Sequence, residues 1–289
     1  MQTKEATAAS AAADLQHLAL PANAQVLFAS DMHLGEHDPA TANWFCAALE
    51  ERVFSVRASH LVLLGDLFEA WVGDDQTDAV ANGLVELIAR LSNATPVFVM
   101  RGNRDFLLDT PLHGTRSAHE STAPTHQPFS QLAGATMLAD PCVLTIAGER
   151  WVLTHGDVLC TDDSRYQAFR LESRAPEWQQ TFLAQPLSQR MALATQMRAQ
   201  SEQEKSNKAA YLTDVNQGAV EACLLAHDAL RMIHGHTHRP ATHNWVTNGH
   251  SFVRHVLPDW DYANRAGGFG LLSAKGFETL AAEQANASN

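Results

Sequence analysis

The stretch Met232-Ile233-His234-Gly235-His236-Thr237-His238 places three histidines at alternate positions, directly behind an apolar run that is typical of a strand. Side chains alternate between two faces of an extended backbone, so the three imidazoles are expected on one side. Neutral imidazole is the commonest metal ligand in proteins, and two or three of them converging from one loop can hold a divalent cation. The stretch therefore predicts a metal site, to which the other motifs of the chain contribute ligands.

Length, charge and cysteine usage narrow the class of protein. With 289 residues, 45% of them hydrophobic, the chain can form one large domain or two small ones. Its formal net charge of -12 argues against nucleic acid as a partner, because phosphate backbones are bound through clustered Lys and Arg. The four cysteines form no Cys-x-x-Cys pair, which argues against structural zinc and a disulfide framework and favours the cytoplasm.

Apolar strands alternate with helical patterns along much of the chain. This alternation predicts an α/β fold in which helical crossovers join strands and the functional edge lies at the strand carboxyl ends. Helices are predicted at residues 39–56, 78–91 and 214–226. Strands are predicted at residues 25–30, 60–64, 97–100, 142–146, 150–154, 232–234, 242–246, 252–257 and 268–273.

Composition divides the chain into a core and additional segments. Residues 164–207 are helical in pattern, and two interpretations stay open for them: a helical pair packed on the core, or a cap over the site. The predicted units are a mobile N-terminal extension at 1–23, a core at 24–163 and 208–276, the helical cap or lid at 164–207, and a C-terminal tail at 277–289.

Five predicted strands are each followed by side chains that can bind a metal. One such strand end is ordinary turn chemistry, but five are hard to ascribe to turn preference alone. Oxygen and nitrogen donors without a thiolate suit two divalent cations in an open catalytic site. Two-metal sites hold a water between the cations and promote displacement at phosphorus, which predicts phosphoester or phosphoanhydride hydrolysis. The seven expected ligands are Asp31, His33, Asp66, Asn103, His155, His236 and His238.

The order of these motifs, Asp-x-His, Gly-Asp, Gly-Asn-Arg-Asp, His and Gly-His-x-His, resembles that of the calcineurin-like metallophosphoesterases. The resemblance implies a four-layer fold with two facing mixed β-sheets flanked by helices, here with an inserted helical cap. It implies one ion bound by Asp31, His33, Asp66 and His238. It implies a second ion bound by Asp66, Asn103, His155 and His236. His234 lies outside this ligand set, and we interpret it as a strand-end histidine with an ordinary hydrogen bond.

Residue 104 bears on the kind of phosphoester. Many members of the superfamily have His there, which resembles an acid that protonates a poor leaving group. Arg104 keeps its proton and can only clamp phosphate oxygens, which suits a phosphate leaving from a diphosphate linkage. Arg104 therefore indicates a pyrophosphatase and not a protein phosphatase.

Longer strings at 28–34, 64–75, 102–107, 154–163 and 233–240 resemble the branch of the superfamily that hydrolyses UDP-2,3-diacylglucosamine in lipid A biosynthesis of Gram-negative bacteria. The resemblance implies release of UMP and 2,3-diacylglucosamine 1-phosphate, by a metal-activated water attacking the phosphorus nearer uridine. It implies two Mn2+ ions, with other divalent metals possible, and a catalytic role for Asn103, Arg104 and His236. The substrate contacts it implies are Asn103, Arg104, Asp163, Ser201, Lys205, Lys208 and His236.

A substrate with two acyl chains needs an apolar slot beside a charged diphosphate site. Residues 178–197 can line such a slot, and Arg198, Lys205 and Lys208 can supply the charge. We expect a monomer that is associated peripherally with the cytoplasmic side of the inner membrane. Two alternatives stay open: a dinuclear phosphohydrolase of soluble cyclic nucleotides or dinucleoside polyphosphates, and a non-catalytic binding module on the same fold.

Overall fold

The computed structural model describes residues 14–112, 126–207 and 214–283, with side chains described outside 200–207. Its strands are β1 Leu15–Leu20, β2 Val26–Ala29, β3 His60–Leu64, β4 Val97–Met100, β5 Ala135–Ile146, β6 Glu149–Leu153, β7 Arg231–His234, β8 Ala241–Thr247, β9 His250–Val256, β10 Gly268–Ser273 and β11 Gly276–Ala281. Its helices are α1 Pro39–Ser55, α2 Ala79–Ser92, α3 Phe129–Ala133, α4 Ser164–Ser173, α5 Pro176–Leu183, α6 Leu187–Asn207 and α7 Gln217–Ala226, with a 3-10 turn at Asp157–Leu159.

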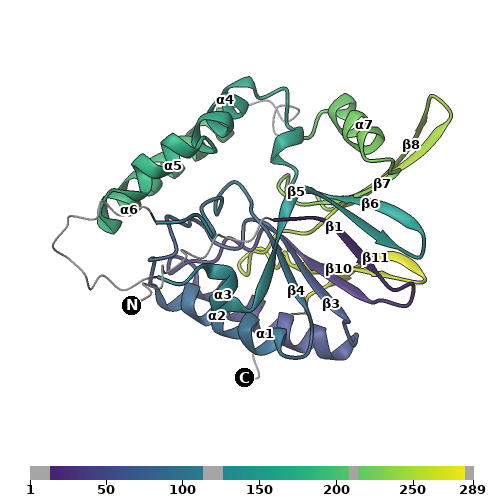
Figure 1. The fold of residues 1–289 in the computed structure, drawn as a ribbon, viewed down its shortest axis with the longest axis horizontal. Coiled ribbons are helices and arrows are strands. Elements are labelled where there is room, and N and C mark those ends of the chain that lie inside the picture. The colour runs from purple at the N-terminus through teal and green to yellow at the C-terminus, as the bar shows by residue number, and fades with distance from the viewer. Residues whose placement is uncertain (1–13, 113–125, 208–213, 284–289) are drawn as a thin grey trace, which may run out of the picture.

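The described strands form one mixed sheet of 11 strands that curls back on itself (Figure 1). Their order is β11-β10-β2-β3-β4-β5-β6-β7-β9-β8, and β1 pairs with β5 outside this path. Strand β5 joins the two parts, because residues 135–138 pair with β4 and residues 142–146 pair with β6. We call β11, β10, β2, β3 and β4 the first half-sheet, and β6, β7, β9 and β8 the second half-sheet. The two facing sheets that were expected are these two halves.

Three apolar cores confirm the four layers. Helices α1, α2 and α3 pack against the first half-sheet through side chains such as Phe45, Leu84 and Phe129. A second core, which includes Phe28 of the first half-sheet and Trp151 of the second, lies between the two halves. The third core packs α7 against the outer face of the second half-sheet. The layers are therefore helices, half-sheet, half-sheet and helix.

Local capping explains where the first two helices begin. The Asp38 carboxylate accepts a hydrogen bond from the Thr41 N–H at 3.1 Å, and Pro39 occupies the first helical position of α1. Asp78 caps α2 in the same way, through the Ala81 N–H at 2.8 Å. These caps hold the helices in the places predicted for them, within one residue at each end.

Four segments differ from the prediction. Residues 15–20 form β1 inside the predicted mobile extension, and residues 276–281 form β11, most of it inside the predicted tail, so both predictions are wrong there. Strand β5 begins at Ala135, seven residues before the predicted strand. Residues 164–207 form the three helices α4, α5 and α6 in place of the helical pair.

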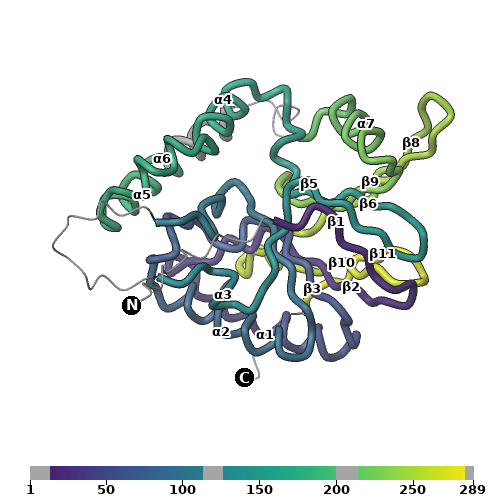
Figure 2. Tube along the Cα trace, in the orientation of Figure 1, coloured from purple at the N-terminus to yellow at the C-terminus, as the bar shows by residue number. Residues whose placement is uncertain are grey.

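The helices α4, α5 and α6 form a group at the upper left of Figures 1 and 2, away from α1 and α2. In the chain they follow β6 and precede α7. None of the helices in the described part of the chain is both long and apolar enough to cross a bilayer.

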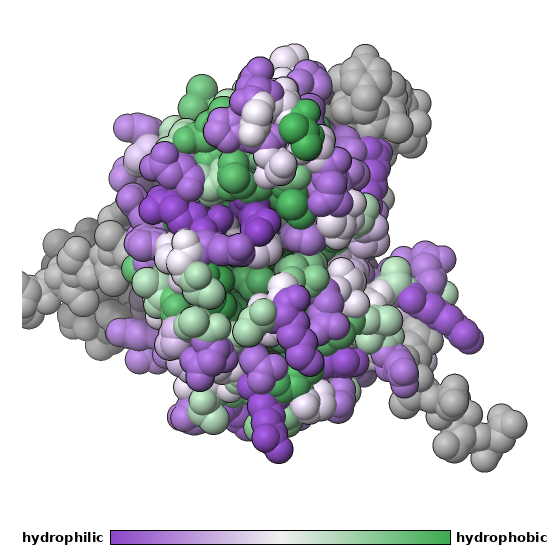
Figure 3. Space-filling model, turned by 90° about the vertical axis from the view of Figure 1, so that its right-hand side faces the viewer, coloured by the Kyte–Doolittle hydropathy of each residue, from purple (hydrophilic) through white to green (hydrophobic). Residues whose placement is uncertain are grey.

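Figure 3 views the molecule from the right-hand side of Figure 1, where α7 and β8 lie. Hydrophobic residues gather in several areas of this face, and hydrophilic residues run between them. Large apolar side chains are exposed on both elements, among them Leu225 of α7 and Val246 of β8. The apolar surface on this side is therefore divided into small areas.

Candidate metal centre and adjoining pocket

The predicted ligands follow the carboxyl ends of five strands of the curled sheet, three on one side of β5 and two on the other. Asp31 and His33 follow β2, Asp66 follows β3, and Asn103 follows β4, all in the first half-sheet. The second half-sheet supplies His155 after β6, and His236 and His238 after β7. The curl of the sheet brings these two sets together, because β5 pairs with β4 through its first part and with β6 through its second.

Five of the seven predicted ligands have a left-handed backbone, with φ between 49° and 66°. Such conformations are uncommon for residues other than glycine and persist where the surrounding structure holds them. Here the loops after β2 and β3 hold each other: the Asp31 N–H donates to the Gly65 carbonyl at 3.1 Å, and the His33 N–H donates to the Asp66 carbonyl at 3.0 Å. The five residues are Asp31, His33, Asp66, His236 and His238.

Two glycines of the motifs allow a close approach of the ligand carboxylates. A Cβ atom at Gly102 would overlap the Asp66 carboxylate, and one at Gly235 would overlap the Asp31 carboxylate. The Gly-Asn and Gly-His pairs of the sequence therefore have a steric reason, since only glycine leaves room for a carboxylate at the neighbouring strand end.

A first group of ligands surrounds His33. Its Nε2 atom lies 3.1 Å from His238 Nε2, 3.7 Å from Asp66 Oδ2 and 3.9 Å from Asp31 Oδ1. His238 Nε2 lies 3.5 Å from the same Asp31 oxygen, which is buried and accepts no hydrogen bond from a described residue. Two ring nitrogens and two carboxylates that converge in this way fit a divalent cation.

A second group surrounds His155. Its Nε2 atom lies 3.0 Å from Asn103 Oδ1 and 3.6 Å from Asp66 Oδ1, while its Nδ1–H donates to the Leu64 carbonyl at 2.9 Å. That hydrogen bond leaves Nε2 unprotonated in the neutral ring and ready for a metal. The ring of His236 lies 5.1 Å from that of His155. Asp66 directs Oδ2 to the first group and Oδ1 to the second, so its carboxylate joins the two groups.

The electrostatics of the two groups favour cations. Burial raises the pKa of Asp66. At Asp31 the contact with His238 and the charges of the nearby histidines outweigh burial and hold the pKa well below its usual range. Despite burial, the charges of Asp66, Asp31 and Asp157 raise the pKa of His155 to about 9. Protonated histidines therefore supply positive charge beside the carboxylates. Bound metal ions would supply this charge instead.

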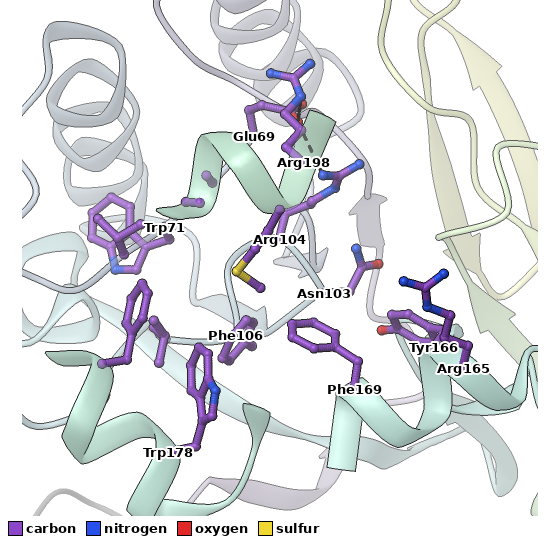
Figure 4. Close-up of a pocket in the computed structure, with 16 residues that line it drawn as sticks. Glu69, Trp71, Asn103, Arg104, Phe106, Arg165, Tyr166, Phe169, Trp178 and Arg198 are labelled. Carbon is purple, nitrogen blue, oxygen red and sulfur yellow. Dashed lines mark ion pairs between the residues drawn. The ribbon is translucent and has the colours of Figure 1, made fainter. Parts of the chain in front are cut away.

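A pocket of about 280 Å3 opens beside the second ligand group (Figure 4). One side of it is polar, with Asn103, Arg104 and Arg198 among its lining residues. The other side is aromatic, with Trp71, Phe106 and Trp178. Core loops supply part of the lining, and α4, α5 and α6 supply the rest.

Comparison with known proteins identifies the family. Residues 24–240, well over half of the chain, match the family described as Calcineurin-like phosphoesterase. The chain belongs to the calcineurin-like phosphoesterase family. This membership implies binding of divalent metal, and the two ligand groups are where the phosphoesterase offers donors for it.

Relatives of this phosphoesterase that bear the name UDP-2,3-diacylglucosamine hydrolase cover most of its length. The protein of Aromatoleum aromaticum is 43% identical over 81% of this chain and 88% of its own. That of Xanthomonas axonopodis is 42% identical over 81% of this chain and 90% of its own. That of Chromobacterium violaceum is 40% identical over 88% of this chain and 97% of its own.

The remaining predicted residues of the phosphoesterase make other contacts or lie outside the described residues. Asp163 caps α4 by accepting a hydrogen bond from the Tyr166 N–H at 3.1 Å. His234 is buried; its Nδ1–H donates to the Gly235 carbonyl at 2.8 Å, which agrees with an ordinary hydrogen bond. Ser201 and Lys205 lie in the part of α6 whose side chains are not described, and Lys208 lies outside the described residues.

Sequence reasoning missed two carboxylates near the site, Glu69 and Asp157. Asp157 is buried behind His155; it accepts hydrogen bonds from the Tyr166 hydroxyl and from Arg170 Nε at 2.9 Å, and so fixes α4 to the metal centre of the phosphoesterase. Glu69 lies in the pocket and contacts Arg104 and Arg198. Both belong to strings quoted for the resemblance, which is the signal that could have drawn attention to them.

Proposed function

We propose that this phosphoesterase hydrolyses the diphosphate bond of UDP-2,3-diacylglucosamine and releases UMP and 2,3-diacylglucosamine 1-phosphate. The observation that carries the proposal is the pocket. Asn103 and Arg104, from the loop after β4, line the same pocket as a set of aromatic side chains. A diphosphate needs polar and positively charged side chains to bind its oxygens, and acyl chains need an apolar surface. The names of the relatives support the same substrate.

The proposed cofactors are two Mn2+ ions, held by the seven predicted ligands with Asp66 between them. Bound divalent cations supply an activated water and neutralise charge on phosphate oxygens. The donor set, mixed oxygen and nitrogen without a thiolate, fits such ions. Other divalent metals also suit these donors.

The side chains of the pocket and the metal centre would bind the substrate, orient it and exclude water. Arg104, whose side chain is 14% exposed and lines the pocket, clamps the diphosphate and neutralises the departing phosphate without giving up its proton. Asn103 and His236 orient the phosphorus nearer uridine toward the attacking water. The aromatic side chains Trp71, Phe106 and Trp178 take up acyl chain and exclude bulk water.

We also propose that α4, α5 and α6 act as a cap that receives the acyl chains. Lipid of this kind resides in a bilayer, so the enzyme must reach its surface to collect the substrate. We therefore propose peripheral association of a monomer with the cytoplasmic side of the inner membrane. Binding to vesicles with and without the lipid substrate tests this part separately from the chemistry.

Hydrolysis in oxygen-18 water tests the reaction and the point of attack. We expect Mn2+-dependent turnover with the label in UMP, and loss of turnover in Asn103→Ala and His236→Ala with the fold intact. Label in the sugar phosphate would reject attack at the phosphorus nearer uridine. Equal turnover of cyclic nucleotides or dinucleoside polyphosphates would instead favour an enzyme of soluble nucleotides.

A further inference from the structure

Glu69 lies where three parts of the site meet. Its main chain is held by the loop after β2, because the Glu69 N–H donates to the Leu34 carbonyl at 3.0 Å. Its side chain is 12% exposed and lines the pocket between the core and α6. One carboxylate oxygen lies toward His33 of the metal centre. The other faces the arginines of the pocket (Figure 4).

The first contact is with a predicted metal ligand. Glu69 Oε2 lies 3.6 Å from Nδ1 of His33, the ring nitrogen that points away from the ligand group. His238, the other histidine of that group, has a carboxylate in the same relation, because Asp259 Oδ2 lies 3.3 Å from its Nδ1. Carboxylates behind metal-binding histidines fix the ring and raise its basicity.

The second contact is with two arginines at once. Glu69 Oε1 lies 3.6 Å from Arg104 Nη1 of the core and 2.6 Å from Arg198 Nε of α6. Two guanidinium groups repel each other when they lie side by side, and a shared carboxylate oxygen offsets that repulsion. The arginines therefore stay together on the polar side of the pocket before any substrate arrives.

A carboxylate near a diphosphate also carries a cost, since like charges repel. Here one carboxylate stands against two guanidinium groups, so the formal charge of the three side chains together is still positive. Holding both arginines in place saves the entropy that each would lose on meeting the substrate. The positioning effect therefore outweighs the repulsion, and removal of the carboxylate weakens substrate binding.

We propose that Glu69 is a positioning residue that aligns Arg104 and Arg198 for the diphosphate, joins α6 to the core, and orients His33 for its metal ion. The nature of the anion rests on the proposed function. The link between metal ligand, arginine pair and inserted helix rests on the contacts alone.

Three variants that each remove a single carboxylate charge separate these effects. Glu69→Gln removes all three contacts of the carboxylate with little change in size. Asp259→Asn removes only the carboxylate behind a metal histidine, since the ion pairs of the described residues give Asp259 no arginine. Asp75→Asn removes only a tie between the core and α6, because Asp75 accepts a hydrogen bond from Arg190 Nη1 at 2.8 Å, away from the metal centre.

Three measurements on the full chain give the readouts: Mn2+ affinity by electron paramagnetic resonance, hydrogen exchange of the α6 amides at residues 187–199, and KM with kcat for UDP-2,3-diacylglucosamine. We expect Mn2+ affinity to fall about tenfold in Glu69→Gln and in Asp259→Asn. We expect faster exchange in Glu69→Gln and in Asp75→Asn. A rise in KM of about tenfold is expected in Glu69→Gln and not in Asp259→Asn.

An unchanged or lower KM in Glu69→Gln would overturn the proposal, because the carboxylate would then compete with the substrate instead of preparing its site. Unchanged α6 exchange or unchanged Mn2+ affinity in that variant would overturn it as well. Failure of the wild-type chain to hydrolyse the lipid nucleotide would reject the proposed function instead. The Mn2+ and exchange measurements need no substrate and would still decide the role of Glu69.

Discussion

Arg104 serves the site with both its main chain and its side chain. Its N–H donates to Asp66 Oδ1 at 2.8 Å, which fixes the carboxylate placed to bridge the two ligand groups. Its guanidinium lines the pocket. A substitution at this position therefore removes the proposed phosphate clamp while the hydrogen bond to the metal centre stays.

We expect Arg104→Ala to lower kcat/KM for the lipid nucleotide about 100- to 1000-fold, as for the loss of one donor to developing charge, and to leave Mn2+ affinity close to that of the wild type. Steady-state kinetics and Mn2+ titration measure the two effects. Arg101→Ala is the matched control in the same loop, because Arg101 Nε donates to the Leu108 carbonyl at 2.6 Å and the residue is not among those that line the pocket. Equal losses in both variants would contradict a clamp at residue 104.

The residues of the metal centre could be predicted because each directly follows an apolar strand, so local sequence shows both the strand and the donor. Glu69 and Asp259 could not be predicted in this way. Each acts on a histidine that is distant in the chain, and a lone carboxylate in a loop has no spacing that distinguishes it from surface charge. Only the folded structure shows that these two carboxylates contact histidines of the metal centre.

At the scale of elements, α6 is tied to the loop after β3 by Arg190. This side chain is only 2% exposed; it donates to the Val72 carbonyl and pairs with the Asp75 carboxylate. Gly73 lies between these two partners with φ of 137°, and a Cβ atom there would overlap the Arg190 guanidinium. The glycine therefore allows the helix to approach the core.

We expect Gly73→Ala to reduce the free energy of unfolding by about 1–3 kcal/mol, because the backbone is strained for any other residue and the arginine must move. Hydrogen exchange of α6 should become faster. The same substitution at Gly83, inside α2 with open space around it, is expected to stabilise the protein by about 0.5–1 kcal/mol. Denaturant unfolding measures the change in the free energy of unfolding in both variants. If both substitutions stabilised the protein, or both destabilised it, the steric argument would be refuted.

Elements with a strong local signal were predicted, and those that depend on a distant partner were not. Strands β3, β4 and β10 lie at the predicted residues, since each is a continuous buried run. Strand β1 has one buried residue, Leu18, and its partner β5 lies more than 120 residues away in sequence. The sequence of β1 alone therefore resembles a solvated extension, and only the sheet edge offered by β5 makes it a strand.

The whole molecule is closed by contacts between its two half-sheets. His255 of β9 stacks on Phe277 of β11, with ring centroids 4.1 Å apart, and so joins the second half to the first. Burial, together with the charge of Arg231, lowers the pKa of His255 to about 4. A histidine pKa that is lowered in the folded state contributes stability above the unfolded value near 6.5, and this contribution is lost as the pH falls toward 4.

We expect the stability advantage of the wild type over His255→Gln to shrink as the pH is lowered from 7 to 4. Urea unfolding of the two proteins across this range measures the difference, in which groups common to both cancel. A difference that is independent of pH would show that His255 does not titrate at this contact.

Each predicted ion also draws on both half-sheets. His238 completes a first group with Asp31 and His33, which follow β2, and His155 completes a second group with Asp31 and Asp66. The predicted second ion also takes Asn103 and His236, which follow β4 and β7. We expect Mn2+ at about 100 times its dissociation constant to add about 2.7 kcal/mol to the free energy of unfolding for each bound ion, and chelation to remove it. Thermal unfolding with and without chelator measures the effect, with His238→Ala as the variant that loses the first site. Identical unfolding temperatures in all conditions would contradict metal binding at this centre.

The passage of a single long strand, β5, from one half of the sheet to the other has a mechanical consequence. Strand pairing secures the halves along β5, and at the carboxyl ends a few hydrogen bonds join them, such as those from His155 to the Leu64 carbonyl and from the His236 N–H to Asp31. Bound cations would add cross-links between the same loops, so we expect chelation to loosen the catalytic edge before it affects the paired strands along β5.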